Sequence, residues 1–145
     1  MKKVLLSLSA MVLLSGISMA ATQNIAVVDV QAIVNKSAQV QSLKKEQQTK
    51  IADLEKWLKT AQEDVAKQQS KEGKEKLLKK YNSEFAKKKE VIAKDYKTKL
   101  SAVDKSITET ITTKAKAMGY DMVISKSMVI MGGDDITAEI QKVVK

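Results

Sequence analysis

Through the middle of the chain, apolar residues recur three or four positions apart, which is the spacing of a coiled-coil seam. A first series runs Val40, Leu43, Gln47, Ile51, Leu54, Leu58, Ala61 and Val65. A second runs Leu78, Tyr81, Phe85, Ile92, Tyr96, Leu100, Val103, Ile107, Ile111 and Ala115, with Lys88 at one place where an apolar residue is expected. The pattern predicts two long helices that pack against each other.

A polar stretch, residues 68–74, separates the two series and contains Gly73. Glycine is favoured where a helix ends and the chain turns. We therefore expect residues 37–116 to form an antiparallel coiled-coil hairpin, the arm, with its tip near Gly73. Arm helices of roughly 35 to 45 residues would be on the order of 50 to 65 Å long, at 1.5 Å per residue.

Before the first series the pattern is that of a short strand followed by a short helix. Residues 24–30 (NIAVVDV) form an apolar, β-branched run, which is typical of a strand buried on both faces. Residues 31–35 are expected to be helical, and Asp29 is placed to cap them.

After the second series, Gly119 predicts the end of the long helix, because glycine readily adopts the left-handed conformation. Residues 120–125 (YDMVIS) and 128–131 (MVIM) are apolar runs, predicted as a strand hairpin that turns at residues 126–127. Beyond two glycines, the acids at residues 134–135 are expected to cap a terminal helix that begins at Ile136.

These patterns predict an α+β fold, mostly α, in which residues 21–36 and 117–145 form one small head. A unit of this size is near the lower limit for a self-sufficient core, and some of its strands would have exposed edges. We therefore expect an oligomer whose strands close into a shared barrel. The apolar residues expected at the subunit contacts are Ile25, Val27, Met122, Ile124, Val129 and Met131.

The first twenty residues have the pattern of a secretory signal peptide. Two lysines precede an apolar stretch, and Ser18, Met19 and Ala20 form a small-x-small cleavage site. The apolar stretch is too short to span a bilayer. The sequence predicts export through the Sec pathway, cleavage after Ala20 and a periplasmic location.

Composition limits the chemistry, because the chain has no histidine, cysteine or arginine. Imidazole or thiolate metal sites and Ser-His-Asp or Cys-His triads cannot be built without these residues. We expect a protein that is not an enzyme and has no metal or cofactor. The absence of cysteine also means that packing has to stabilise the fold without disulfides.

Positive charge is concentrated in the arm. Between Leu43 and Lys116, twenty lysines stand against twelve acids. Such a surface suits nucleic acid, an anionic membrane surface or acidic proteins. Export argues against a physiological nucleic-acid partner.

The order of the motifs resembles the Skp (OmpH) family of periplasmic chaperones. The resemblance rests on IAVVDVQAIV, a basic helical hairpin, GYDMVIS and DDITAEIQKVV, and it extends over nearly the whole chain after residue 20. It implies a homotrimer in which strands of three chains form a barrel from which three helical arms project. It also implies unfolded outer-membrane β-barrel proteins as clients. Nothing in the sequence resembles a phosphate-binding loop, so we expect clients to be held without ATP.

Several arm residues are candidates for client binding. Trp57 adjoins the seam, where packing is the more frequent role of a tryptophan. Leu77 and Val91 share a helical face off the seam, and Lys87, Lys88 and Lys89 form the densest positive cluster. A structural adaptor that binds a folded partner or a lipopolysaccharide surface is the alternative function, and the same basic arms would suit it.

Overall fold

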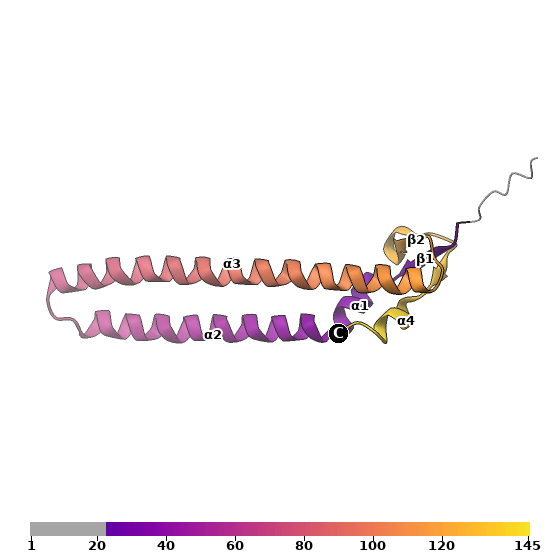
Figure 1. The fold of residues 1–145 in the computed structure, drawn as a ribbon. Coiled ribbons are helices and arrows are strands. Elements are labelled where there is room, and N and C mark those ends of the chain that lie inside the picture. The colour runs from indigo at the N-terminus through magenta and orange to yellow at the C-terminus, as the bar shows by residue number, and fades with distance from the viewer. Residues whose placement is uncertain (1–22) are drawn as a thin grey trace, which may run out of the picture.

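The computed structural model describes residues 23–145, so the predicted signal peptide lies outside the described range. The elements follow the order β1 (Ile25–Val28), α1 (Val30–Lys36), α2 (Ala38–Lys67), α3 (Lys71–Ala117), β2 (Met122–Ser125), the 3₁₀ turn η1 (Lys126–Met128), β3 (Asp134–Asp135) and α4 (Thr137–Gln141). Two long helices lie side by side, and the strands and short helices gather at one end (Figure 1). The predicted mostly helical fold with a small sheet is confirmed.

The short first helix begins where the sequence predicted. Asp29 has extended backbone geometry, and its Oδ1 accepts a hydrogen bond from the Ala32 N–H at 2.9 Å. This bond satisfies one of the free N–H groups at the start of α1. Ser37 ends α1 and caps α2, because its hydroxyl oxygen accepts from the Val40 N–H.

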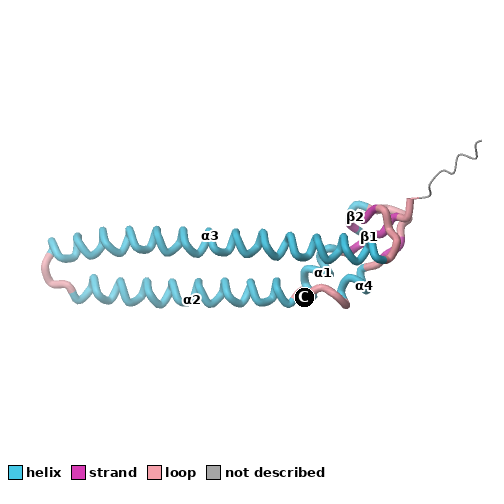
Figure 2. The backbone as a smooth tube through the Cα atoms, in the orientation of Figure 1, coloured by secondary structure: helices cyan, strands magenta, loops and turns pink. Residues whose placement is uncertain are grey.

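The connection between the long helices is shorter than predicted, and Gly73 is not part of it. Residues 68–70 join α2 to α3 at the end far from the sheet (Figure 2). Ser70 caps α3 by accepting from the Gly73 N–H at 3.0 Å. A Cβ at Gly73 would lie 2.6 Å from Ser70 Oγ, so glycine leaves room for the cap instead of making the turn.

The end of α3 is as predicted. Gly119 has a φ of 87°, and the Tyr120 N–H donates to the Ala115 carbonyl at 3.1 Å. The glycine thus accepts the left-handed conformation that lets the chain leave the helix. Tyr120 packs against the core of the head.

The sheet is parallel throughout, which contradicts the predicted hairpin. Its order is β2-β1-β3, and both outer strands run parallel to β1. Residues 126–127 form a 3₁₀ turn and not a hairpin turn, and residues 128–131 are not a strand. The sequence at this junction lacks the Asn-Gly type of signal that a tight hairpin needs. The chain crosses over instead and places β3 on the other edge of β1.

The two acids before the last helix form β3, and α4 begins one residue later than predicted. Asp135 Oδ1 accepts from the Thr137 N–H at 3.0 Å. The residue at the cap position is Ile136, whose side chain is buried and makes no capping bond.

The core of the head draws on both ends of the chain. Its buried residues are Ala26, Val28, Ile33, Ile107, Ala115, Ile136 and Ile140. They come from β1, α1, α3 and the region of α4. The last turns of α3 are therefore packed into the head, which fixes the direction in which the long helices leave it.

Candidate functional site

Trp57, the first predicted client-binding residue, lies in an aromatic cluster between α2 and α3. Its ring makes an edge contact with Tyr81, at 5.7 Å between centroids and 79° between planes. It is parallel to the Phe85 ring at 6.4 Å. Both geometries are favoured by aromatic quadrupoles. Packing is therefore one role of Trp57, and the ring remains half-buried.

Lysines surround this cluster. Lys88 Nζ lies 5.2 Å from the Trp57 ring centroid, Lys89 Nζ 5.5 Å from Phe85, and Lys80 Nζ 5.7 Å from Tyr81. These distances are within the range of cation–π attraction. Of the predicted lysines, Lys88 thus lies over the predicted tryptophan and Lys89 over the neighbouring Phe85 ring, whereas sequence reasoning missed Lys80.

Val91 and the remaining lysine line a groove nearer the head. The groove is formed by Lys50, Asp53, Leu54, Lys87, Lys88, Val91 and Ile92. Val91 is 66 % exposed, so its apolar side chain is open to solvent between ammonium groups. Leu77 is half-buried, whereas its neighbour Leu78 is 47 % exposed and lines a groove beside Trp57.

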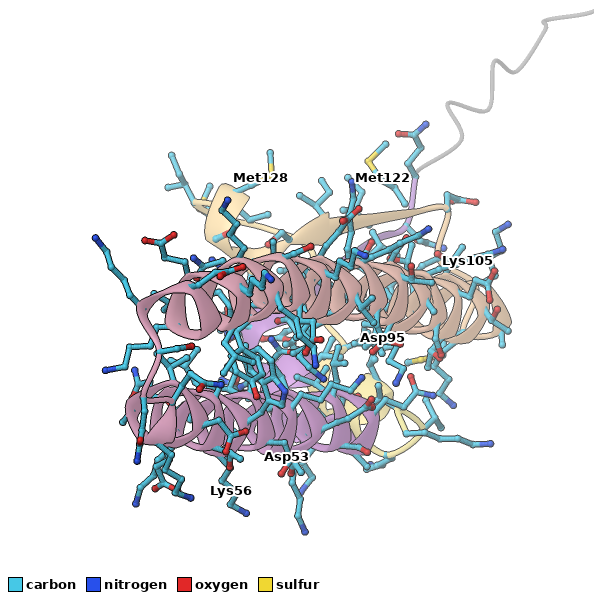
Figure 3. All side chains as sticks on the ribbon, turned by 90° about the vertical axis from the view of Figure 1, so that its left-hand side faces the viewer. Asp53, Lys56, Asp95, Lys105, Met122 and Met128 are labelled. Atoms are coloured by element: carbon cyan, nitrogen blue, oxygen red, sulfur yellow. The ribbon has the colours of Figure 1, made fainter. Side chains whose placement is uncertain are left out.

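A four-residue charge cluster, Glu46, Lys50, Asp95 and Lys99, joins the two long helices closer to the head. Lys50 Nζ lies 2.6 Å from Glu46 Oε1 and is also paired with Asp95 across the helices. Lys99 Nζ lies 3.3 Å from Asp95 Oδ2 and is paired with Glu46. Figure 3 shows Asp95 between the two helices, whereas Asp53 and Lys56 point away.

The charge cluster shifts the pKa values of Glu46, Lys50 and Asp95. Hydrogen bonds from Lys50, with a second from Lys99, lower the pKa values of the Glu46 and Asp95 carboxyls. The hydrogen bond to Asp95, followed by that to Glu46, raises the pKa of Lys50. Each of these shifts stabilises the charged form of its group, so Glu46, Lys50 and Asp95 are ionised at neutral pH.

The six predicted subunit-contact residues divide into two groups. Val27 is buried within the chain, while Ile25, Ile124 and Val129 are half-buried. Met122 and Met131 are exposed, Met131 at 92 %. Met128 is 79 % exposed, and sequence reasoning missed Ile130, which is fully exposed. Met122 and Met128 project on the side of α3 away from α2 (Figure 3).

Within residues 23–145, no three carboxylates are grouped so that they could hold a metal ion. No helix in this range combines the length and the apolar character needed to cross a bilayer. Comparison of the chain with models of known protein families gives no match, and comparison with curated protein sequences gives none either.

Proposed function

We propose that this protein is an ATP-independent holdase of the Skp (OmpH) type, which keeps unfolded outer-membrane proteins soluble in the periplasm. The observation that carries the proposal is the form of the chain. A pair of long lysine-rich helices extends from a small head that has exposed apolar side chains. The resemblance in motif order supports the same conclusion.

In this proposal α2 and α3 form an antiparallel coiled-coil hairpin, and three chains assemble through their heads. The exposed residues Met122, Met128, Ile130 and Met131 support the assembly, because apolar side chains in such number on a small head favour burial against another surface. Three arms projecting from one shared barrel would enclose a space between them.

Lysine suits the inner surface of such a space. Its aliphatic stem covers apolar groups while its ammonium group stays hydrated, and it imposes little directional preference. Each exposed charge pair contributes only ~0 to 1 kcal/mol, so a client is held by many weak contacts together. Salt weakens such binding, and a client that begins to fold can dissociate.

The test is an aggregation assay with a urea-denatured, acidic β-barrel protein diluted into buffer. We expect an equimolar amount of the assembled protein to suppress light scattering without nucleotide, and added salt to weaken the suppression. Scattering unchanged by the protein would refute the holdase and favour a structural adaptor that binds a folded partner or an anionic lipopolysaccharide surface.

A further inference from the structure

Beside the aromatic cluster, α2 and α3 leave a groove of about 370 Å³. Trp57, Tyr81 and Phe85 supply aromatic surface, and the exposed Leu78 forms part of its edge. Ala61 is buried in it at a seam position whose neighbours, Leu58 and Val65, are larger. A small side chain among large rings leaves the hollow open.

The walls of the groove are held in place. The Tyr81 hydroxyl donates a hydrogen bond to Asp64 Oδ2 at 2.8 Å, which ties α3 to α2 at this level. The hydrogen bond to the Asp64 carboxylate also raises the pKa of Tyr81, so the phenol keeps its proton. The rings therefore present a preformed surface that does not need to be ordered when a ligand arrives.

The charge around the groove selects an acidic occupant. Residues 57–65 and 78–89 contain six lysines against three carboxylates. Two of those carboxylates are engaged within the chain, Asp64 by Tyr81 and Glu84 by Lys80 at 3.9 Å. The arm of a second copy would bring the same excess of lysine and be repelled, whereas an acidic chain would be attracted.

We propose that this groove is a docking site for a single aromatic side chain in an acidic, unfolded polypeptide segment. The proposal rests on the holdase function and locates part of its client contact. The volume is at the lower end of the roughly 300 to 1,000 Å³ typical of ligand pockets, which suits one side chain. An aromatic guest can take the offset-stacked or edge-on positions that aromatic rings favour.

Trp57 is the only tryptophan of the chain, so its fluorescence reports on the groove directly. The probe is an unstructured synthetic peptide with alternating phenylalanine and aspartate, without tryptophan or tyrosine. A second peptide has alanine in place of every phenylalanine and the same charge. We expect the first peptide to change Trp57 emission saturably and the alanine peptide to bind at least several-fold more weakly.

A variant adds negative charge at the groove without touching its packing. Gln62 and Asn82 are exposed groove residues, so Gln62→Glu with Asn82→Asp should weaken binding of the phenylalanine peptide by about three- to tenfold, the effect of two exposed like-charge contacts. The matched control is Gln48→Glu with Ser101→Asp, two exposed arm positions with the same change in net charge. Circular dichroism verifies that both variants keep their helices.

Selective weakening by the groove variant supports the docking site, even if the aggregation assay shows no holdase activity; in that case only the holdase is refuted. Equal weakening in both variants, equal binding of the two peptides, or Trp57 emission that never changes would overturn the docking site. Any of these results, together with normal suppression of aggregation, would leave the holdase in place.

Discussion

At Gly133 the chain passes so close to β1 that a side chain would not fit. A Cβ there would lie 2.5 Å from Val27 Cγ2, and the φ of 79° is one that side chains disfavour. Gly132 has a similar φ of 94°, but a Cβ at that position would meet open space. Comparing a substitution at Gly132 with the same one at Gly133 therefore separates the cost of the left-handed backbone from the cost of the overlap with Val27.

We expect Gly133→Ala to destabilise the head more than Gly132→Ala does. Both changes force a left-handed residue, at a cost of about 1 to 2 kcal/mol, and only the first also displaces Val27. Hydrogen exchange of the β1 amides, measured by mass spectrometry, should quicken more in Gly133→Ala. Equal exchange in the two variants would mean that the close contact with Val27 has no energetic role.

Residues whose role is set by their immediate neighbours could be predicted from the sequence. Asp29 caps α1 and Gly119 ends α3 because both effects act within one helical turn. The role of Gly73 could not be predicted, since it depends on the cap made by Ser70. Across α2 and α3, Lys50 pairs with Asp95, Asp64 with Tyr81 and Trp57 with Lys88, which is the register that a turn centred near Gly73 sets.

Among the elements, the start of α3 gives a test of the cap that Ser70 makes. Replacing a glycine inside a helix by alanine ordinarily stabilises it by roughly 0.5 to 1 kcal/mol. Here we expect Gly73→Ala to gain less, because the new methyl group would displace Ser70 Oγ from its capping position. In a Ser70→Ala background there is no cap to lose, and only the flexible Gln68 side chain, 2.7 Å from the new methyl group, has to move, so the same change should be more favourable than in the presence of the cap.

Urea unfolding of the four proteins in this double-mutant cycle measures the coupling. Ser70→Ala alone should cost about 1 kcal/mol, the usual value of an N-cap. Additive effects of the two substitutions would contradict a cap that depends on Gly73.

The charge cluster makes the stability of the paired long helices depend on pH, and the pKa shifts give the direction of the change. The pKa values of Glu46 and Asp95 are lowered in the folded state, so their stabilisation is present above the unfolded value of about 4 and is lost as the pH falls through the folded values. Lys50 has a raised pKa, so its contribution is present below about pH 10 and is lost above its folded value.

Thermal unfolding followed by circular dichroism should therefore show a plateau of stability between about pH 5 and 9, with a decline on the acid side. Glu46→Gln with Asp95→Asn should unfold at a lower temperature at neutral pH and decline less in acid. The control is Glu55→Gln with Glu63→Gln, two exposed positions on α2. If the unfolding temperature falls equally steeply with decreasing pH in both variants, the charge cluster is not the cause of the loss of stability in acid.

Among the elements, the pairing of the strands could not be predicted from the sequence. Apolar, β-branched character located β1 and β2, but it could not choose between a hairpin and a crossover. Pairing in a sheet is decided by distant partners, and the strand at residues 134–135 is made of two aspartates that no strand pattern selects. Its position follows from the hydrogen bonds of β1 and from the glycines before it.

For the whole molecule, the exposed apolar side chains of the head predict assembly. Ile130 and Met131 are almost fully exposed in the single chain. We expect Ile130→Asp with Met131→Asp to dissociate the proposed oligomer, because burying two carboxylates in an apolar contact is strongly unfavourable. Light scattering coupled to size-exclusion chromatography measures the mass.

The control for that experiment is the variant with Gln48→Glu and Ser101→Asp, which has the same change in net charge on the arm. It should keep the mass of the unmodified protein. Dissociation of both variants, or of neither, would contradict an assembly made through this surface of the head.

Native mass spectrometry of the protein with and without one denatured outer-membrane β-barrel protein tests most directly whether the arms of an assembled chain hold a client. We predict a homotrimer in the absence of the client, and a new species of three chains with one client when it is added, formed without nucleotide. A monomer in both samples, or a trimer that never acquires the client, would contradict the proposed function.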